Sequence, residues 1–91
     1  MRRVHLSIRG HVQGVSFRYH ARRRAESLSL AGWVRNCRDG SVEAVAQGAD
    51  DAVAAFVEWA HRGPSGAAVE RVETHDEQPD GALHGFRILS G

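Results

Sequence analysis

The amino-acid sequence predicts an α+β fold in which two helices cover one face of an antiparallel sheet. Three observations predict this fold class. Two stretches have the apolar spacing of amphipathic helices. Several shorter stretches are rich in β-branched residues or alternate between apolar and polar side chains, as strands do. Glycine-containing turn signals separate these stretches, so the expected order is strand, helix, strand, strand, helix, strand.

The first strand and the first helix are expected within the first 30 residues. Apolar and polar side chains alternate from Val4 to Arg9, which is the period of a half-buried strand, and Gly10 ends it. After a loop that contains a further glycine, a helix is expected from about Phe17 to Leu30. Its expected buried face consists of Phe17, Ala21, Ala25 and Leu28.

The middle of the chain predicts a hairpin followed by a second helix. Strands are expected over residues 33–37 and 42–47, joined by a turn in which Asp39 precedes Gly40. Asp50 is the expected N-cap of the helix, and the Gly-Pro pair at 63–64 ends it. The apolar face of this helix is expected to be Val53, Phe56, Val57 and Ala60.

Two further strands complete the expected sheet. One runs from Val69 to about His75, with a bulge or other irregularity because Val69 and Val72 are out of phase. A short last strand is expected over residues 86–89. A strand–helix–strand unit that occurs twice in this way is the split βαβ, or ferredoxin-like, arrangement βαββαβ.

Length and composition restrict the class of protein. The 91 residues make one expected domain, 1–91, which is too short for a barrel enzyme or a two-domain cofactor enzyme. No apolar run approaches the roughly 20 residues that span a bilayer, and the start of the chain does not resemble a signal peptide. The single cysteine, Cys37, excludes an intramolecular disulfide and a cysteine-based metal cluster. A cytoplasmic protein without membrane contact is therefore expected.

The charges are unevenly distributed along the chain. Residues 1–40 contain nine arginines and two acidic residues, a net charge of +7, whereas residues 41–91 contain three arginines and nine acidic residues, a net charge of −6. An anion site in the first half is one explanation. A codon bias toward high GC content is the other, and composition alone favours it.

The loop before the first helix is a candidate anion site. The first backbone N–H groups of a helix have no intrahelical partners and carry partial positive charge. Gly14 allows the chain to turn so that successive N–H groups converge. Arg18 lies in the first helical turn, and its guanidinium suits a tetrahedral oxyanion. A tight turn with a surface arginine is the alternative interpretation.

A second candidate residue is Asn36, near the end of the second expected strand. Its amide can both donate and accept hydrogen bonds. It is therefore able to hold a water molecule, and the alternative is that it only shapes the turn.

Together, these two segments resemble the acylphosphatase family. Residues 10–18 match the pattern Gly-x-Val-Gln-Gly-Val-x-Phe-Arg at every specified position. The second pattern begins Gly-aromatic-Val-Arg-Asn, and its matching residues are Gly32, Trp33, Val34, Arg35, Asn36, Gly40, Val42 and Gly48. The resemblance covers essentially the whole chain, because the length and the element order agree as well.

The resemblance implies hydrolysis of the carboxyl–phosphate bond of acyl phosphates to a carboxylate and inorganic phosphate. It implies that Asn36 positions the attacking water and that no metal ion, cofactor or covalent enzyme intermediate is involved. The implied partner is a small acyl phosphate, with phosphate or a similar anion at the loop, and the chain is expected to be a monomer. The implied phosphate ligands are the Arg18 side chain and the backbone N–H groups of Gln13, Gly14, Val15, Ser16, Phe17 and Arg18.

Two other classes of function remain open from the sequence. A domain of this fold can bind an acyl phosphate or another anion without hydrolysing it. An RNA-binding module is the third hypothesis, because residues 22–24 are all arginine. RNA-binding domains of this fold stack bases on aromatic residues of central strands, and residues 42–47 contain none, so no nucleic acid partner is expected.

The remaining reactive residues receive no catalytic role. The six histidines lack the paired spacing of metal ligands, and His11 and His20 near the loop are interpreted as solvated side chains. Regular alternation along the strand places Cys37 on the opposite side from Asn36, so no nucleophilic role is assigned to it.

Overall fold

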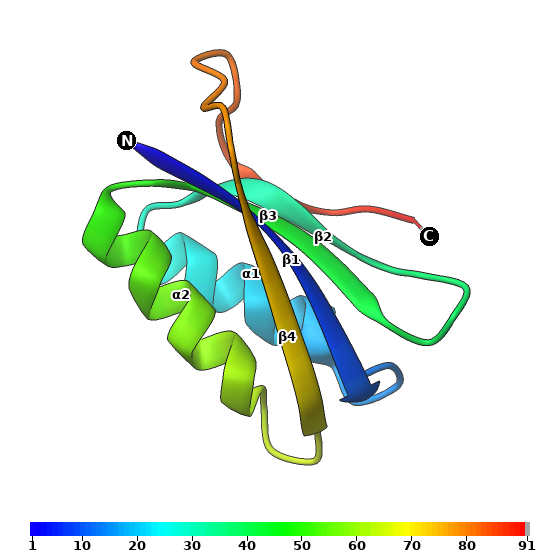
Figure 1. Cartoon of the computed structure of the whole chain (residues 1–91). Coiled ribbons are helices and arrows are strands. Elements are labelled where there is room, and N and C mark those ends of the chain that lie inside the picture. Colours follow the sequence, from blue (N-terminus) through cyan, green and yellow to red (C-terminus); the bar gives the residue numbers. More distant parts are fainter. Residues whose placement is uncertain (91) are drawn as a thin grey trace.

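The computed structural model describes residues 1–90 and folds as a five-stranded sheet with two helices (Figure 1). The expected order βαββαβ is confirmed, and a short fifth strand follows it. The elements are β1 (Arg2–His11), α1 (Phe17–Ser27), β2 (Ala31–Asn36), β3 (Val42–Gly48), α2 (Asp50–Arg62), β4 (Ala68–Glu77) and β5 (Phe86–Ile88). The ends of the strands lie within two residues of the expected ones. Neither helix is long and apolar enough to cross a membrane.

The antiparallel sheet that was expected is formed by β4, β1, β3 and β2, and the short strand β5 adds one parallel pair that makes the sheet mixed. The strands lie in the order β4-β1-β3-β2-β5. β1 pairs antiparallel with both β3 and β4, and β2 pairs antiparallel with β3, but β5 runs parallel to β2. The segment between β4 and β5 carries the chain from one edge of the sheet to the other. The parallel neighbours β2 and β5 are connected along the chain through β3, α2 and β4.

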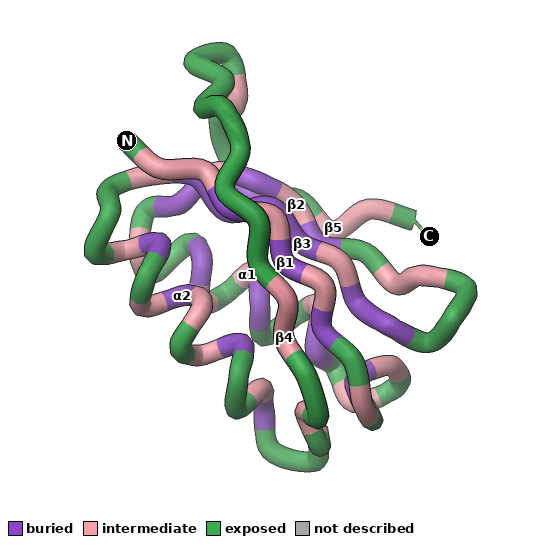
Figure 2. The backbone as a smooth tube through the Cα atoms, in the orientation of Figure 1, coloured by how far each residue is buried: buried purple, intermediate pink, exposed green. Residues whose placement is uncertain are grey.

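Both helices lie on the same face of the sheet (Figure 1). The core lies between the helices and the sheet, where the buried residues of both layers are found (Figure 2). The alternation predicted for β1 is confirmed, since Val4, Leu6 and Ile8 are fully buried. The expected helix faces also pack inward, with Leu28 and Val57 only partly buried. The buried helix residues are Phe17, Ala21, Ala25, Val53, Phe56 and Ala60.

Helix α1 ends three residues before the expected position. Ser29 has a left-handed backbone (φ 58°), which ends the helix. The N–H of Leu30 donates to the carbonyl of Ala25 at 2.9 Å, and the N–H of Ser29 donates to that of Glu26 at 3.0 Å. This is the hydrogen-bond pattern of a Schellman motif. The apolar pattern of the helix continues through Leu28 to Leu30, although the helix does not. Leu30 is apolar because it is buried in the core after the chain has left the helix.

The N-cap of α2 is Ala49, so the assignment of that role to Asp50 was wrong by one residue. The N–H of Val53 donates to the carbonyl of Ala49 at 3.0 Å, which makes Asp50 the first helical residue. Asp50 and Asp51 therefore lie in the first turn, where their negative charge interacts favourably with the helix dipole.

The expected irregularity in β4 is a bulge at Glu70. Arg9 pairs with Arg71 and Gly10 pairs with Val69, so Glu70 has no partner of its own in β1. Gly10 has φ 129°, and a Cβ atom at this position would lie 2.2 Å from the carbonyl oxygen of Ala68. The two backbones approach this closely because residue 10 has no side chain. The bulge lies where β1 leads into the loop before α1.

Candidate active site

Arg18 and Asn36 lie in the wall of one pocket at the N-terminus of α1. The pocket has a volume of about 350 Å³, which is large enough for a small ligand. The structure thus brings together two residues that the sequence separates by a helix and a turn. The pocket is lined by Val12, Gly14, Ser16, Phe17, Arg18, Tyr19, Asn36 and Ile88.

The loop before α1 leaves the helix N-terminus without a side-chain cap. Gly14 and Ser16 have left-handed backbones, with φ of 76° and 61°, and the Ser16 hydroxyl makes no capping hydrogen bond. The first backbone bond of the helix runs from the N–H of His20 to the carbonyl of Ser16, at 3.1 Å. The N–H groups before His20 in the first turn therefore have no intrahelical acceptor. With no acidic residue in that turn and with Arg18 present, this end of the pocket is positive.

The alternation of β2 aims Asn36 at the pocket. Gly32 and Val34 are buried under the helices, and Asn36 follows with the same parity. Asn36 pairs with Val42 at the last position of the β2–β3 ladder. Cys37 does not line the pocket, and its N–H donates to the carbonyl of Ser41 at 2.8 Å to begin the turn.

The residues expected to bind phosphate fall into two groups. Gly14, Ser16, Phe17 and Arg18 line the pocket. Gln13 and Val15 do not: Val15 packs against the core, and the Gln13 side chain is hydrogen-bonded to the hairpin between β2 and β3. For these two residues, only the backbone N–H is a candidate phosphate ligand.

The hairpin beyond Asn36 is held in shape by Asp39. The Oδ1 atom of Asp39 accepts hydrogen bonds from the Ser41 hydroxyl at 2.6 Å and from the Ser41 N–H at 3.0 Å. Its Oδ2 atom accepts one from Arg9 at 3.1 Å. The Ser41 hydrogen bonds, with help from Arg9, lower the pKa of Asp39 to about 2. The carboxylate is therefore ionised, and the hairpin fixed, at any pH above about 4.

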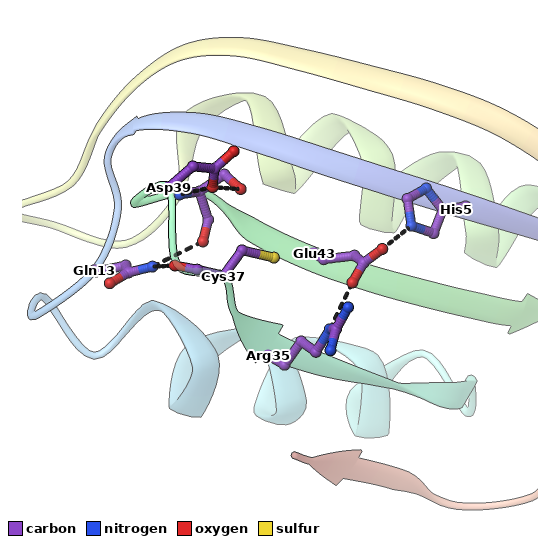
Figure 3. Close-up of polar contacts among 7 residues, drawn as sticks. His5, Gln13, Arg35, Cys37, Asp39 and Glu43 are labelled. Atoms are coloured by element: carbon purple, nitrogen blue, oxygen red, sulfur yellow. Dashed lines mark hydrogen bonds and ion pairs between the residues drawn. The ribbon is translucent and has the colours of Figure 1, made fainter. Parts of the chain in front are cut away.

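A second polar cluster occupies the sheet face away from the helices. The carboxylate of Glu43 accepts a hydrogen bond from Arg35 at 2.6 Å and contacts His5 Nε2 at 2.6 Å (Figure 3). Burial alone would raise the pKa of Glu43, but the contacts with His5 and Arg35 outweigh it and lower the pKa. The guanidinium of Arg35 also lies over the ring of Trp33. Arg35 belongs to the second motif, yet it stabilises this face and does not line the pocket.

Three residues that line the pocket were missed from the sequence. Two of them could have been found from their position in the sequence, since Tyr19 directly follows Arg18 and Val12 lies within the first motif. Ile88 belongs to the short last strand expected over residues 86–89, but its place in the pocket depends on the parallel pairing of β5 with β2, where Ile88 lies opposite Val34.

The histidines near the loop do not line the pocket either. The interpretation of His20 as merely solvated was incomplete, since its Nδ1–H donates to the carbonyl of Ser16 at 2.9 Å. Within residues 1–90, no group of three His, Cys, Asp or Glu side chains lies close enough together to hold a metal ion.

Comparisons with known proteins agree with the resemblance. Residues 4–88 match the family model described as Acylphosphatase. The chain is 56% identical over 90 residues to an acylphosphatase of Thiobacillus denitrificans, covering 99% of each, and 51% identical over 87 residues to one of Thermococcus kodakarensis, covering 96% and 94%. Its fold is similar to the crystal structure of acylphosphatase from Bacillus subtilis, with a TM-score of 0.94, 35% identity and coverage of 98% and 99%. The chain therefore belongs to the acylphosphatase family.

Proposed function

We propose that this member of the acylphosphatase family hydrolyses acyl phosphates by direct attack of water, with Arg18 holding the phosphoryl group and Asn36 positioning the water. Acyl phosphate hydrolysis is the activity of the family. The proposal adds the roles of the residues. Its main support is that Arg18 and Asn36 line one pocket at an uncapped helix N-terminus.

The phosphoryl group is bound by positive charge and by backbone donors. Arg18 offers a fork of N–H groups that matches two phosphoryl oxygens. The backbone N–H groups of residues 13–18 surround the remaining oxygens, as at other phosphate-binding helix N-termini. These donors are fixed before substrate arrives, so they stabilise the charge on the transferring phosphoryl group without reorganising. The roles assigned to Arg18 and the loop require no metal ion.

The reaction balances without a covalent intermediate. The water oxygen forms a bond to phosphorus, while the bond between phosphorus and the acyl oxygen breaks and its electron pair leaves on the carboxylate. The proton of the water passes to a phosphoryl oxygen. Residues 1–90 place no carboxylate, imidazole or thiol in the pocket wall, so the substrate itself is the proton acceptor in this scheme.

Asn36 supplies position rather than charge. Its amide oxygen accepts a hydrogen bond from the water and leaves an oxygen lone pair free to face phosphorus. Since a carboxylate is a good leaving group, no general acid is required. The rate then depends on the placement of water relative to the bound phosphoryl group.

Hydrolysis of benzoyl phosphate in the presence of EDTA tests the proposal, with wild type, Arg18→Ala and Asn36→Ala compared after circular dichroism has verified folding. We expect activity with EDTA, and a loss of about 10² to 10³-fold in each variant. Arg18→Ala should also weaken inhibition by inorganic phosphate, whereas Asn36→Ala should not. A wild type that binds phosphate but hydrolyses nothing would indicate a binding domain, and folded variants with full activity would exclude the assigned roles.

A further inference from the structure

The side chain of Gln13 links the two segments that carry Arg18 and Asn36. Its Nε2 atom donates hydrogen bonds to the carbonyl oxygens of Cys37, at 2.7 Å, and Ser41, at 2.9 Å. Figure 3 shows the Gln13 amide pointing from the loop before α1 toward this hairpin. A primary amide nitrogen has two N–H groups, so both are used.

The two acceptors lie where the hairpin closes. Cys37 directly follows Asn36, and Ser41 directly precedes Val42, the β3 partner of Asn36. Within the turn, the Ser41 carbonyl also accepts from the Cys37 N–H at 2.8 Å, and the Cys37 carbonyl accepts from the Gly40 N–H at 3.2 Å. Gln13 therefore holds the hairpin at the residues next to Asn36.

The sheet itself does not make this connection. β1 and β3 pair only as far as Ile8 and Val42, so the loop over residues 12–16 lies beyond the ladder. The ion pair of Arg9 with Asp39 joins the hairpin to β1 and not to the loop. In the part of the chain that the structure describes, the two hydrogen bonds of Gln13 are the ones that join residues 12–16 to residues 37–41.

We infer that Gln13 is a positioning residue for hydrolysis, which sets the place of Asn36 relative to the phosphate-binding loop through its side chain. This inference rests on the proposed function, because it gives Asn36 the water. The phosphoryl group is held by Arg18 and the loop, which belong to one continuous segment. Without the Gln13 amide, Asn36 shifts relative to the phosphoryl group while the phosphate ligands remain. A displacement of about 1 Å at a reacting centre costs on the order of 10²-fold in rate.

Gln13→Met removes both hydrogen bonds and keeps a side chain of similar length. We expect kcat for benzoyl phosphate to fall between about tenfold and about 100-fold, while the inhibition constant of inorganic phosphate changes by less than about threefold. A side chain that served only to stabilise the fold would leave kcat of the folded protein unchanged. The split between kcat and phosphate affinity is therefore the decisive readout.

The chain offers a matched control in Gln47. The buried amide of Gln47 also makes two hydrogen bonds to backbone, donating to the carbonyl of Asp80 at 2.8 Å and accepting from the Asp80 N–H at 2.9 Å. Gln47 does not line the pocket. Gln47→Met should lower stability by an amount similar to Gln13→Met and leave kcat unchanged.

Gln13→Glu provides a pH-dependent readout. Its ionised carboxylate has no proton to donate and faces two carbonyl oxygens, whereas the protonated carboxyl group can donate one hydrogen bond. We expect the kcat of Gln13→Glu, relative to wild type, to rise as the pH falls and the introduced carboxyl group takes up a proton. A constant ratio across the pH range would contradict the inference.

The remaining outcomes separate this inference from the proposed function. Equal effects of Gln13→Met and Gln47→Met on kcat overturn the inference, and so does a parallel loss of kcat and phosphate affinity in Gln13→Met. In an Asn36→Ala background, Gln13→Met should cause no further loss, because its effect acts through Asn36. If Asn36→Ala alone keeps full activity, the proposed function fails; if it loses activity and Gln13→Met does not, only the role of Gln13 fails.

Discussion

Arg9 and Asp39 form an ion pair, with 3.1 Å between Nη1 and Oδ2, that joins the end of β1 to the turn between β2 and β3. Both side chains are about half exposed, and such surface pairs contribute little to stability. The structural value of Asp39 lies in its two hydrogen bonds with Ser41, which define the turn. This turn places the carbonyl oxygens of Cys37 and Ser41, to which the Gln13 side chain donates its hydrogen bonds.

The turn should weaken in acid as Asp39 takes up a proton. The pKa of Asp39 is about 2 in the folded protein, below its ordinary value of 3.8. A depressed pKa means that the ionised carboxylate stabilises the fold fully above about pH 4, and that this contribution is lost as the pH falls toward 2. We expect the difference in unfolding free energy between wild type and Asp39→Asn to be constant from pH 5 to 8 and to shrink below pH 4. Urea unfolding across this range measures it.

The protonation of Asp39 can be followed directly by NMR. The side-chain carbonyl carbon of Asp39 should titrate with a midpoint near 2 in the folded protein. Ser41→Ala removes the hydroxyl, the largest cause of the shift, and should move the midpoint upward. A midpoint near 4 in the wild type would contradict the geometry of the turn.

Much of the fold could be predicted because each element has a local signal. The alternation of Val4, Leu6 and Ile8, and the breaks in phase between Val69 and Val72, depend only on neighbouring residues. The parallel pairing of β5 has no such signal, because strand direction depends on the path of a long connection. The end of α1 was misplaced for a related reason: Leu30 is apolar because of tertiary burial, not because it is helical.

The candidate site could be predicted only where a motif specified it. Arg18 and Asn36 were identified from two patterns, and the structure places both in one pocket. The contact between the Gln13 side chain and the hairpin was not predicted. Spacing along the chain gives no sign that this side chain donates to a carbonyl oxygen 24 positions away. Ile88 was missed since it reaches the pocket through the parallel strand pair.

Replacement of Ser29 by glycine should stabilise the protein. Ser29 lies in a left-handed conformation (φ 58°) at the C-terminus of α1, where glycine is the preferred residue. A side chain costs about 1 kcal/mol or more in this conformation, and the greater freedom of glycine in the unfolded chain offsets part of that gain. We expect Ser29→Gly to raise the free energy of unfolding by up to about 1 kcal/mol, measured by urea titration. Ser27→Gly, at the last residue of the helix, should instead lower it, because glycine is unfavourable in a helix and the Ser27 hydroxyl donates a hydrogen bond to the carbonyl of Arg24 at 2.7 Å.

Gly10 should tolerate no side chain. A Cβ atom there would lie 2.2 Å from the carbonyl oxygen of Ala68 and 2.8 Å from the backbone nitrogen of Glu70. Because both contacts are with backbone at the bulge, the strands must separate to relieve them. We expect Gly10→Ala to lower the unfolding free energy by more than about 2 kcal/mol.

The control for this change is Gly81→Ala, since a Cβ atom at Gly81 meets nothing within 4 Å. Its effect should lie within about 0.5 kcal/mol of zero. Equal stabilities of the two variants would show that β1 and β4 do not approach each other as closely as this at residue 10.

Inorganic phosphate should stabilise the folded protein through Arg18. A ligand that binds only the folded state raises the unfolding free energy by about 1.4 kcal/mol at ten times its dissociation constant. We expect the melting temperature to rise with phosphate concentration in the wild type and to respond much less in Arg18→Ala. Arg62→Ala, at the exposed C-terminal end of α2, is the control and should keep the full response. Since the ionic strength is the same in all three titrations, a response that survives in Arg18→Ala would place the anion away from the α1 N-terminus and remove the basis for its role in hydrolysis.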